Sequence, residues 1–211
     1  MNWMIPHGAG EGSGTPADRV FMAESIFLNK KQCFWVGEAL EIAETLAEDY
    51  FQVDLGDFER FPYDLQTLEN LKNQERTRRA LAQVCKYEYR HRKAQYTCGG
   101  TDFYRICLQD DKILNTVRTE SLSLLKPLLL YVVTHELIHV IRFSMDPKRF
   151  YLSSKEKRIE ERDVHRSTYE LLRPFKDPQV ELLLERYRPW WGDSSGPDPG
   201  IPALDNLGDR A

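Results

Sequence analysis

One pentapeptide in the second half of the chain, His135-Glu136-Leu137-Ile138-His139, has the residue types and spacing of a metal-dependent hydrolytic site. Residues four apart on a helix lie one above the other, so His135 and His139 can bind one ion between them. Glu136 lies about 100° around the helix from His135, where its carboxylate can act as a general base on water. Imidazole nitrogen is a common zinc ligand, and a catalytic zinc has three protein ligands and one open position. The motif therefore predicts Zn²⁺ ligands at His135 and His139 and a catalytic base at Glu136.

The segment around the motif, Leu124 to Ser144, is mostly apolar and predicts a buried helix. Buried polar groups need partners, and a divalent ion would supply one for these side chains. The alternative is a core helix whose histidines are only hydrogen-bonded. The chain has five histidines, and two of them fall at this spacing with a glutamate between them, which favours the metal site.

Two histidines do not complete a zinc site, so a third ligand is expected downstream. The candidates are Glu160, Glu161, Asp163 and His165. On a helix, Glu161 and His165 are four residues apart and face the same way, whereas Glu160 lies about 100° away. A carboxylate and an imidazole both suit zinc, so the residues alone leave Glu161 and His165 open as the third ligand.

The segment from Glu161 to Pro174 resembles the E-x-x-A-N-x-F-A-x-x-L-L-x-P stretch of ImmA/IrrE-type metallopeptidases, which are gluzincins. With the H-E-x-x-H motif, the resemblance covers residues 124–174. It implies that Glu161 is the third zinc ligand. Val164 stands where the family has Ala, Thr168 where it has a small residue, and His165 where it has Asn or Asp. His165 therefore has two possible roles. It is either a catalytic residue beside the ligands, which stabilises charge during the reaction, or it is itself the third ligand.

Composition narrows the class of protein. A length of 211 residues fits one domain, and a formal net charge of -4 does not favour binding to nucleic acid. The N-terminal segment lacks the features of a secretory signal, and the apolar run from Leu124 to Val133 is too short to span a bilayer. We therefore expect a cytoplasmic protein without a membrane partner. None of the four cysteines forms a C-x-x-C pair, so a structural zinc knuckle is not expected.

The predicted fold class is α+β: a mainly helical zincin-like domain with a small antiparallel sheet and an H-E-x-x-H helix. Residues 1–16 are expected to be a disordered tail, residues 17–188 the domain, and residues 189–211 a turn-rich tail. The H-E-x-x-H helix is expected to be capped by Ser121 or Ser123, with Pro127 in its first turn. The sequence predicts other helices starting near Asp18 and over 35–50, 65–81, 159–173 and 181–188, a hairpin of 84–90 with 102–109, and a short strand over 113–117.

The expected function is that of a zinc metallopeptidase acting on a protein or peptide, in which Glu136 moves the proton of the attacking water. An edge strand over 102–109 could bind substrate by strand addition. Two other classes are open: a metal-binding interaction protein without turnover, and a hydrolase of small amides. The intact Glu136 speaks against the first of these, because a scaffold needs no general base.

Overall fold

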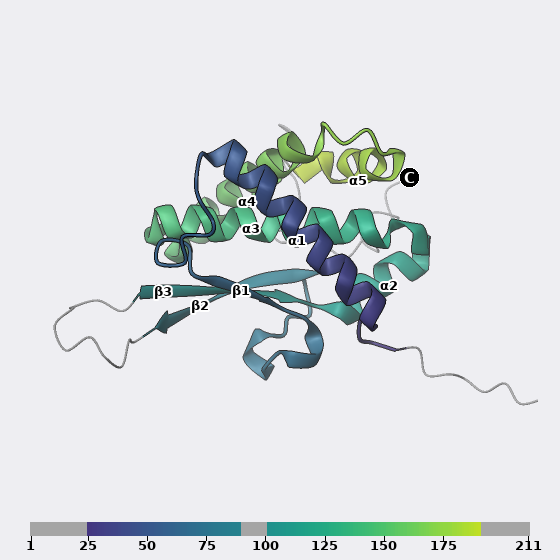
Figure 1. The fold of residues 1–211 in the computed structure, drawn as a ribbon, viewed down its shortest axis with the longest axis horizontal. Helices are drawn as coiled ribbons and strands as arrows, with labels where there is room; N and C mark the ends of the chain where they lie inside the picture. The colour runs from purple at the N-terminus through teal and green to yellow at the C-terminus, as the bar shows by residue number, and fades with distance from the viewer. Residues whose placement is uncertain (1–24, 90–100, 191–211) are drawn as a thin grey trace, which may run out of the picture.

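The computed structural model describes residues 25–89 and 101–190. A three-stranded sheet forms one layer, and helices cover one of its faces (Figure 1). The helices and strands, in chain order, are α1 (Lys30–Phe51), β1 (Tyr63–Gln66), β2 (Ala82–Tyr89), β3 (Thr101–Leu108), α2 (Asp110–Glu120), α3 (Leu125–Met145), α4 (Ser154–Leu172) and α5 (Pro178–Tyr187). Short 3₁₀ turns are η1 (Leu68–Asn70), η2 (Asn73–Glu75), η3 (Leu122–Leu124), η4 (Pro147–Tyr151) and η5 (Arg188–Trp190). The α+β class is confirmed.

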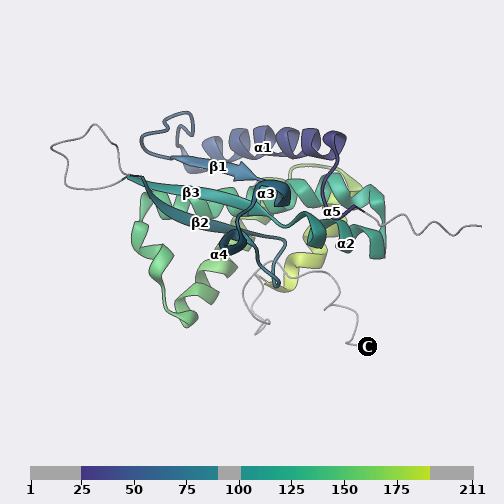
Figure 2. The same cartoon turned by 90° about the horizontal axis from the view of Figure 1, so that it is seen from below.

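The central element is α3, which carries the H-E-x-x-H motif. Every residue from Pro127 to Ile141 is buried, as expected of a helix that is apolar all round. Helix α1 crosses it on one side, α4 and α5 pack on another, and β2 and β3 lie beneath it (Figures 1 and 2). The hydrophobic core therefore surrounds the motif and holds its helix in place.

By length and composition the segment Leu122–Met145 could cross a membrane, contrary to the expectation that its apolar run is too short. Of its most apolar stretch, 94% is buried inside the domain, as in the core helix of a globular fold. The apolar character of this segment is therefore explained by packing.

The sheet has the strand order β1-β3-β2. Strands β2 and β3 pair antiparallel, with Ala82 opposite Leu108 and Tyr89 opposite Thr101, which confirms the predicted hairpin. Strand β1 pairs parallel with β3, so the sheet is mixed, and the expectation of a purely antiparallel sheet is wrong. The sequence places a helix over 65–81 where the chain forms β1 and then the two 3₁₀ turns η1 and η2.

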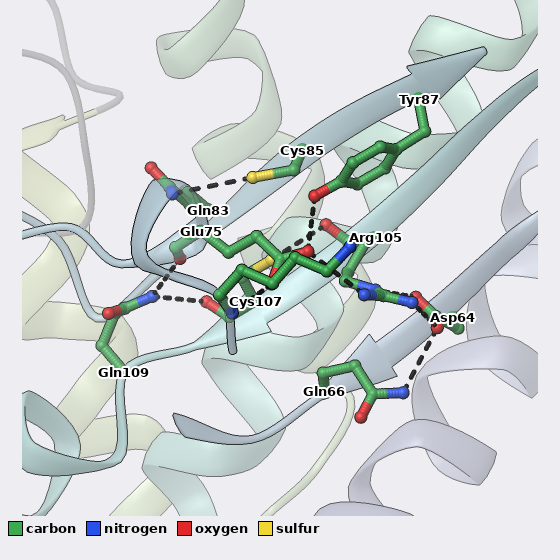
Figure 3. A network of polar contacts seen from close by, with 10 residues as sticks. Asp64, Gln66, Glu75, Gln83, Cys85, Tyr87, Arg105, Cys107 and Gln109 are labelled. Atoms are coloured by element: carbon green, nitrogen blue, oxygen red, sulfur yellow. Dashed lines mark hydrogen bonds and ion pairs between the residues drawn. The ribbon is translucent and has the colours of Figure 1, made fainter. Parts of the chain in front are cut away.

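The face of the sheet away from α3 carries a polar network (Figure 3). Arg105 forms two hydrogen bonds with the Asp64 carboxylate, at 2.8 and 2.7 Å, and one with Glu75 at 3.1 Å. Tyr87 donates to Glu75 at 2.5 Å. These bonds explain β1, because they tie its residue Asp64 to a strand forty residues away, a tertiary contact that local periodicity does not encode.

Several boundaries and element types differ from the sequence expectations. The expected strand over 113–117 is part of helix α2, in which Asp110 and Asp111 occupy the first turn, where acidic groups complement the helix dipole. Ser121 caps η3 rather than α3, and α3 begins at Leu125 without a side-chain cap, with Pro127 in its first turn as expected.

The ends of the helices also shift. Helix α4 starts at Ser154, five residues before the expected start, because Ser153 and Glu156 form a capping box. Helix α5 starts at Pro178 after the cap residue Asp177, and the predicted helix over 35–50 is confirmed as α1. Residues 25 and 26, expected in a helix from Asp18, are not helical; the rest of that helix and the tail over 1–16 lie outside the described residues. Of the expected C-terminal tail, residues 189 and 190 belong to η5, and the remainder is likewise outside them.

Candidate metal centre

The candidate site lies between α3 and α4, two helices joined by the short turn η4. An ion pair fixes them together beside the site: Arg142 on α3 binds both oxygens of Glu160 on α4, at 2.6 and 2.9 Å. Arg149 from η4 adds a third bond to Glu160 at 2.7 Å. Glu160, one of the candidate ligands in the sequence, is therefore held by two arginines and is not available for an ion. Asp163 lies 3.7 Å from Arg142.

Glu161, the next residue, points its carboxylate at the two histidines of the motif. His135 Nε2 lies 3.4 Å from Glu161 Oε2, and His139 Nε2 lies 3.4 Å from Oε1. Two ligands of one tetrahedral zinc, each about 2.0–2.1 Å from the ion, are about 3.3 Å apart. Each motif histidine thus lies at the spacing of two zinc ligands from one oxygen of the Glu161 carboxylate.

The hydrogen bonding of the cluster is incomplete in a way that fits an ion. Glu161 Oε2 is buried and accepts no hydrogen bond within the described residues. The Nδ1 atoms of His135 and His139 also lack a partner there, so a neutral imidazole with its proton on Nδ1 keeps Nε2 as a lone-pair donor toward Glu161. A cation between these atoms would satisfy the buried carboxylate and both Nε2 atoms at once.

His165 lies beside this cluster, one turn after Glu161. One donor atom each from His135, Glu161 and His165 lie within 4.8 Å of one another, and the rings of His135 and His165 are 4.4 Å apart. His165 Nδ1 forms a 2.7 Å hydrogen bond with the Tyr131 hydroxyl, which leaves Nε2 as its nitrogen for an ion. His165 is therefore positioned either as a ligand or as a neighbour of the ligand His135.

Tyr131 is a site residue that the sequence reasoning missed. It is buried and stacks on Tyr187 of α5, with ring centroids 4.4 Å apart. The signal was present in the sequence: Tyr131, His135 and His139 are successive residues four apart, so all three share one face of α3.

Burial shifts the acid–base properties of these groups. Burial raises the pKa of Glu136 to about 8, with Glu161 adding to the shift and His139 opposing it. Burial lowers the pKa of His135, because it disfavours the charged imidazolium form. Burial alone would raise the pKa of Glu161, but the charge of His139 and the close contacts with both histidines outweigh it, so this pKa lies well below the usual range. Glu161 is thus an anion at neutral pH, whereas Glu136 has the proton affinity of a base.

A cavity of about 280 Å³ opens beside the motif. Its polar wall includes His135, Glu136, His139 and Glu161, and its other walls come from the start of β2, from η4 and from α4. Phe143 and Phe150 close one side with aromatic rings, which pack edge to face at 5.4 Å between centroids. The cavity is large enough for a short segment of peptide and too small for a folded domain.

The strand at the edge of this cavity is β2, not β3. The sequence expectation placed substrate binding on the strand over 102–109, but β3 is the central strand and pairs on both sides. In Figure 2, β1 lies toward α1 and β2 toward α4, and Ala82 and Val84 of β2 line the cavity. The error arose because the order of strands depends on the contact with β1, which the sequence did not reveal.

The register of the hairpin identifies the free backbone groups of β2. Gln109 donates its backbone N–H to Leu81 O at 2.8 Å, and bonded and non-bonded pairs alternate along an antiparallel ladder. Ala82, Val84 and Lys86 therefore turn their N–H and C=O groups away from β3. Among the described residues, no strand pairs with this edge, so an extended chain could add to it beside the motif.

The cysteines form no metal site in the part of the chain that the structure describes. Cys33 is exposed, Cys85 is partly buried and Cys107 is buried, and all three are free thiols. Cys98 lies outside the described ranges.

No protein-family model, no curated protein and no solved structure matches this chain. The resemblance to ImmA/IrrE-type gluzincins stays a prediction, and an argument for function therefore depends on the geometry of α3, α4 and β2.

Proposed function

We propose that this protein is a zinc-dependent peptidase of the gluzincin type. The observation that carries the proposal is the position of the Glu161 carboxylate, 3.4 Å from the Nε2 atoms of both His135 and His139. A zinc ion held by these three residues would polarise a carbonyl group and acidify a water molecule. The ligand spacing and the buried Glu161 oxygen without a hydrogen bond support such an ion.

Glu136 is the general base in this proposal. It lines the cavity, is only 5% exposed, and has a pKa raised by burial. In its ionised form this carboxylate would take a proton from the attacking water and later deliver it to the leaving amine. An ion bound next to it would lower its pKa from the value in the metal-free protein, because a nearby positive charge favours the anion.

The free edge of β2 orients the substrate. An extended peptide paired with Ala82, Val84 and Lys86 would run along the cavity, with its backbone held by hydrogen bonds and alternate side chains facing the site. Backbone pairing needs a peptide, so this edge favours a protein or peptide substrate over a small amide. No nucleic acid or membrane is part of the proposal.

A second candidate is a metal-binding protein without turnover. It is favoured by one observation, the presence of His165 in the same cluster as His135 and Glu161. If His165 were a fourth protein ligand, the ion would have no open position, which is the arrangement of a structural zinc site.

The test is metal analysis followed by digestion of a peptide library. Purified protein should bind about one zinc per chain, and His135→Ala and His139→Ala should abolish binding. Zinc-loaded wild type should cleave peptides, and Glu136→Gln should keep the zinc and the melting temperature but lose at least roughly 10²-fold in rate. Glu41→Gln, a change at an exposed residue of α1, is the matched control. Zinc binding without cleavage of any peptide would favour the second candidate, and a Glu136→Gln variant as fast as wild type would refute the mechanism.

A further inference from the structure

The wall of the cavity contributed by α4 carries a lysine one turn before the proposed ligand. Lys157, Glu160 and Glu161 all line the cavity, as residues at i, i+3 and i+4 do when they share a helix face. Lys157 belongs to α4 because this helix starts at Ser154, before the start at residue 159 that the sequence predicted. Its side chain is exposed at the mouth of the cavity, so it borders both solvent and the site.

The charged side chains next to Lys157, those of Arg149 and Glu160, are held in ion pairs. Arg149 lies 2.7 Å from Glu160 and 3.6 Å from Asp146, and Glu160 also binds Arg142. Lys157, by contrast, has no carboxylate within ion-pair distance in the described ranges 25–89 and 101–190. Among the described residues it is therefore a positive charge at the cavity without a neutralising partner.

The two carboxylates that α4 contributes to the cavity do not oppose a further anion near Lys157. Glu160 is neutralised by two arginines, and Glu161 would be neutralised by the ion in the proposed site. The lining residues of β2 and of the segment just before it, and those of the aromatic side, carry no charge: Ala80, Ala82, Gln83, Val84, Phe143 and Phe150. A carboxylate that enters the cavity along α4 would meet the Lys157 ammonium group, which has no ion-pair partner among the described residues.

The separation of Lys157 from Glu161 along α4 predicts which substrate residue carries that carboxylate. Lys157 and Glu161 are one turn apart, about 5.4 Å along the axis. An extended peptide advances about 3.4 Å per residue. A substrate carboxylate beside Lys157 therefore belongs to a residue one or two positions from the peptide bond that lies at the proposed ion.

We propose that Lys157 selects substrates with a carboxylate one or two residues from the cleaved bond. This inference rests on the proposed peptidase function and adds the substrate class. The carboxylate belongs either to an aspartate or glutamate side chain or to the C-terminus of the peptide. Lys157 is a specificity-determining residue in this proposal and takes no part in proton transfer.

The experiment uses the zinc-loaded full chain and a library of dodecapeptides with randomised central positions, made with free and with amidated C-termini. Cleavage sites are read by mass spectrometry. Wild type should enrich Asp or Glu near the cleaved bond by about 1.5- to 5-fold, the range of a solvent-accessible ion pair. If amidation abolishes cleavage near the end of the peptide instead, the selected group is the terminal carboxylate.

Two variants and one control assign the preference to Lys157. Lys157→Gln should lose the enrichment, and Lys157→Glu should replace it with enrichment of Lys or Arg. Lys155→Glu makes the same change in net charge at an exposed residue of α4 that does not line the cavity, and it should retain the preference. All variants should bind zinc as wild type does. Cleavage without acidic enrichment, or enrichment that persists in Lys157→Glu, overturns the inference and leaves the peptidase function standing.

A binding measurement separates the inference from the peptidase proposal. Fluorescently labelled peptide pools, one acidic and one with Gln and Asn in place of Glu and Asp, are titrated with the zinc-loaded protein. Tighter binding of the acidic pool that is lost in Lys157→Glu supports a carboxylate site even if no peptide is cleaved. Equal binding of the two pools refutes the site whether or not the protein is a peptidase.

Discussion

Arg142 on α3 and Glu160 on α4 are joined by two hydrogen bonds of 2.6 and 2.9 Å. Glu160 directly precedes Glu161, whose carboxylate faces the two motif histidines. Glu160 is only 5% exposed, and both arginine bonds are charge-assisted and bidentate. The pair therefore determines how α4 presents Glu161 to α3, although neither residue is itself a proposed ligand.

Replacing Arg142 should weaken both the fold and the metal site. Arg142→Gln leaves the buried Glu160 with Arg149 as its cation, and breaking a buried pair from one side costs about 3–5 kcal/mol. Zinc affinity should fall by about 10- to 100-fold, as for residues that orient ligands. Denaturant unfolding and competition with a zinc chelator measure the two effects. Arg158→Gln, at an exposed residue of α4, is the control, and an unchanged zinc affinity in Arg142→Gln would show that α4 is held by other contacts.

The roles of Glu161 and His165 can be separated by three variants. If Glu161 is the third ligand, Glu161→Ala should weaken zinc binding more than His165→Ala does, because it removes the group that faces both motif histidines. Tyr131→Phe removes the hydrogen bond to His165 Nδ1. If His165 is a ligand, this change should lower zinc affinity by about 10- to 100-fold.

The alternative outcomes are equally clear for zinc affinity measured by chelator competition. A larger loss in His165→Ala than in Glu161→Ala would move the assignment to a site with three histidines. A Tyr131→Phe variant with unchanged zinc affinity and lower thermal stability would show that the Tyr131–His165 bond serves packing.

Proline substitution tests the free edge of β2. Val84→Pro removes an N–H that points away from β3, which an edge strand tolerates, so the protein should fold and bind zinc. Peptide cleavage should fall by about 10-fold in kcat/KM, the effect of one lost hydrogen bond of roughly 1.5 kcal/mol. Cys85→Pro is the matched comparison, because its N–H points toward β3, so the change removes a ladder hydrogen bond and should destabilise the sheet more than Val84→Pro does. Full activity in a folded Val84→Pro variant would exclude strand addition at this position.

The network on the other face of the sheet predicts a pH dependence of stability. Burial alone would raise the pKa of Glu75, but hydrogen bonds from Tyr87 and Lys72 N–H and the interaction with Arg105 outweigh it, so its pKa is lowered. A carboxylate with a lowered folded-state pKa stabilises the protein above the unfolded-state value of about 4.3. That stabilisation is lost as the pH falls through the folded-state value.

The free energy of unfolding in urea should therefore decrease below about pH 5 in chelator-treated protein, where zinc release does not contribute. Glu75→Gln should be less stable at pH 7 and should show a flatter pH profile. Glu69→Gln, at an exposed glutamate of η1, should follow wild type. Parallel profiles for wild type and Glu75→Gln would mean that other carboxylates cause the acid sensitivity.

The parts of the fold that the sequence predicted correctly are those whose signal is local. The alternation in Cys85, Tyr87 and Tyr89 indicated a strand, and the spacing of His135 and His139 with a mostly apolar surround indicated a buried helix. The resemblance to ImmA/IrrE-type metallopeptidases predicted Glu161 as the third ligand. In the structure its carboxylate oxygens lie 3.4 Å from the Nε2 atoms of both motif histidines.

The parts that failed depend on contacts between distant residues. Strand β1 is formed by pairing with β3, where Arg105 also binds Asp64. Leu68 and Leu71 fit a helical period but pack with Cys107. The strand order, and with it the identity of the edge beside the site, follows from this pairing. The tertiary interactions overrode local propensity.

All proposed ligands lie between positions 135 and 165, on two helices joined by one short turn. Bringing these residues together requires closing only a short loop, and the entropy of closure grows slowly with loop length. Contacts of low sequence separation also form early during folding. A metal bound by α3 and α4 would therefore crosslink two elements that are neighbours in the chain, and it would add no direct constraint to the pairing of β1 with β3, where Asp64 meets Arg105 from 41 positions away.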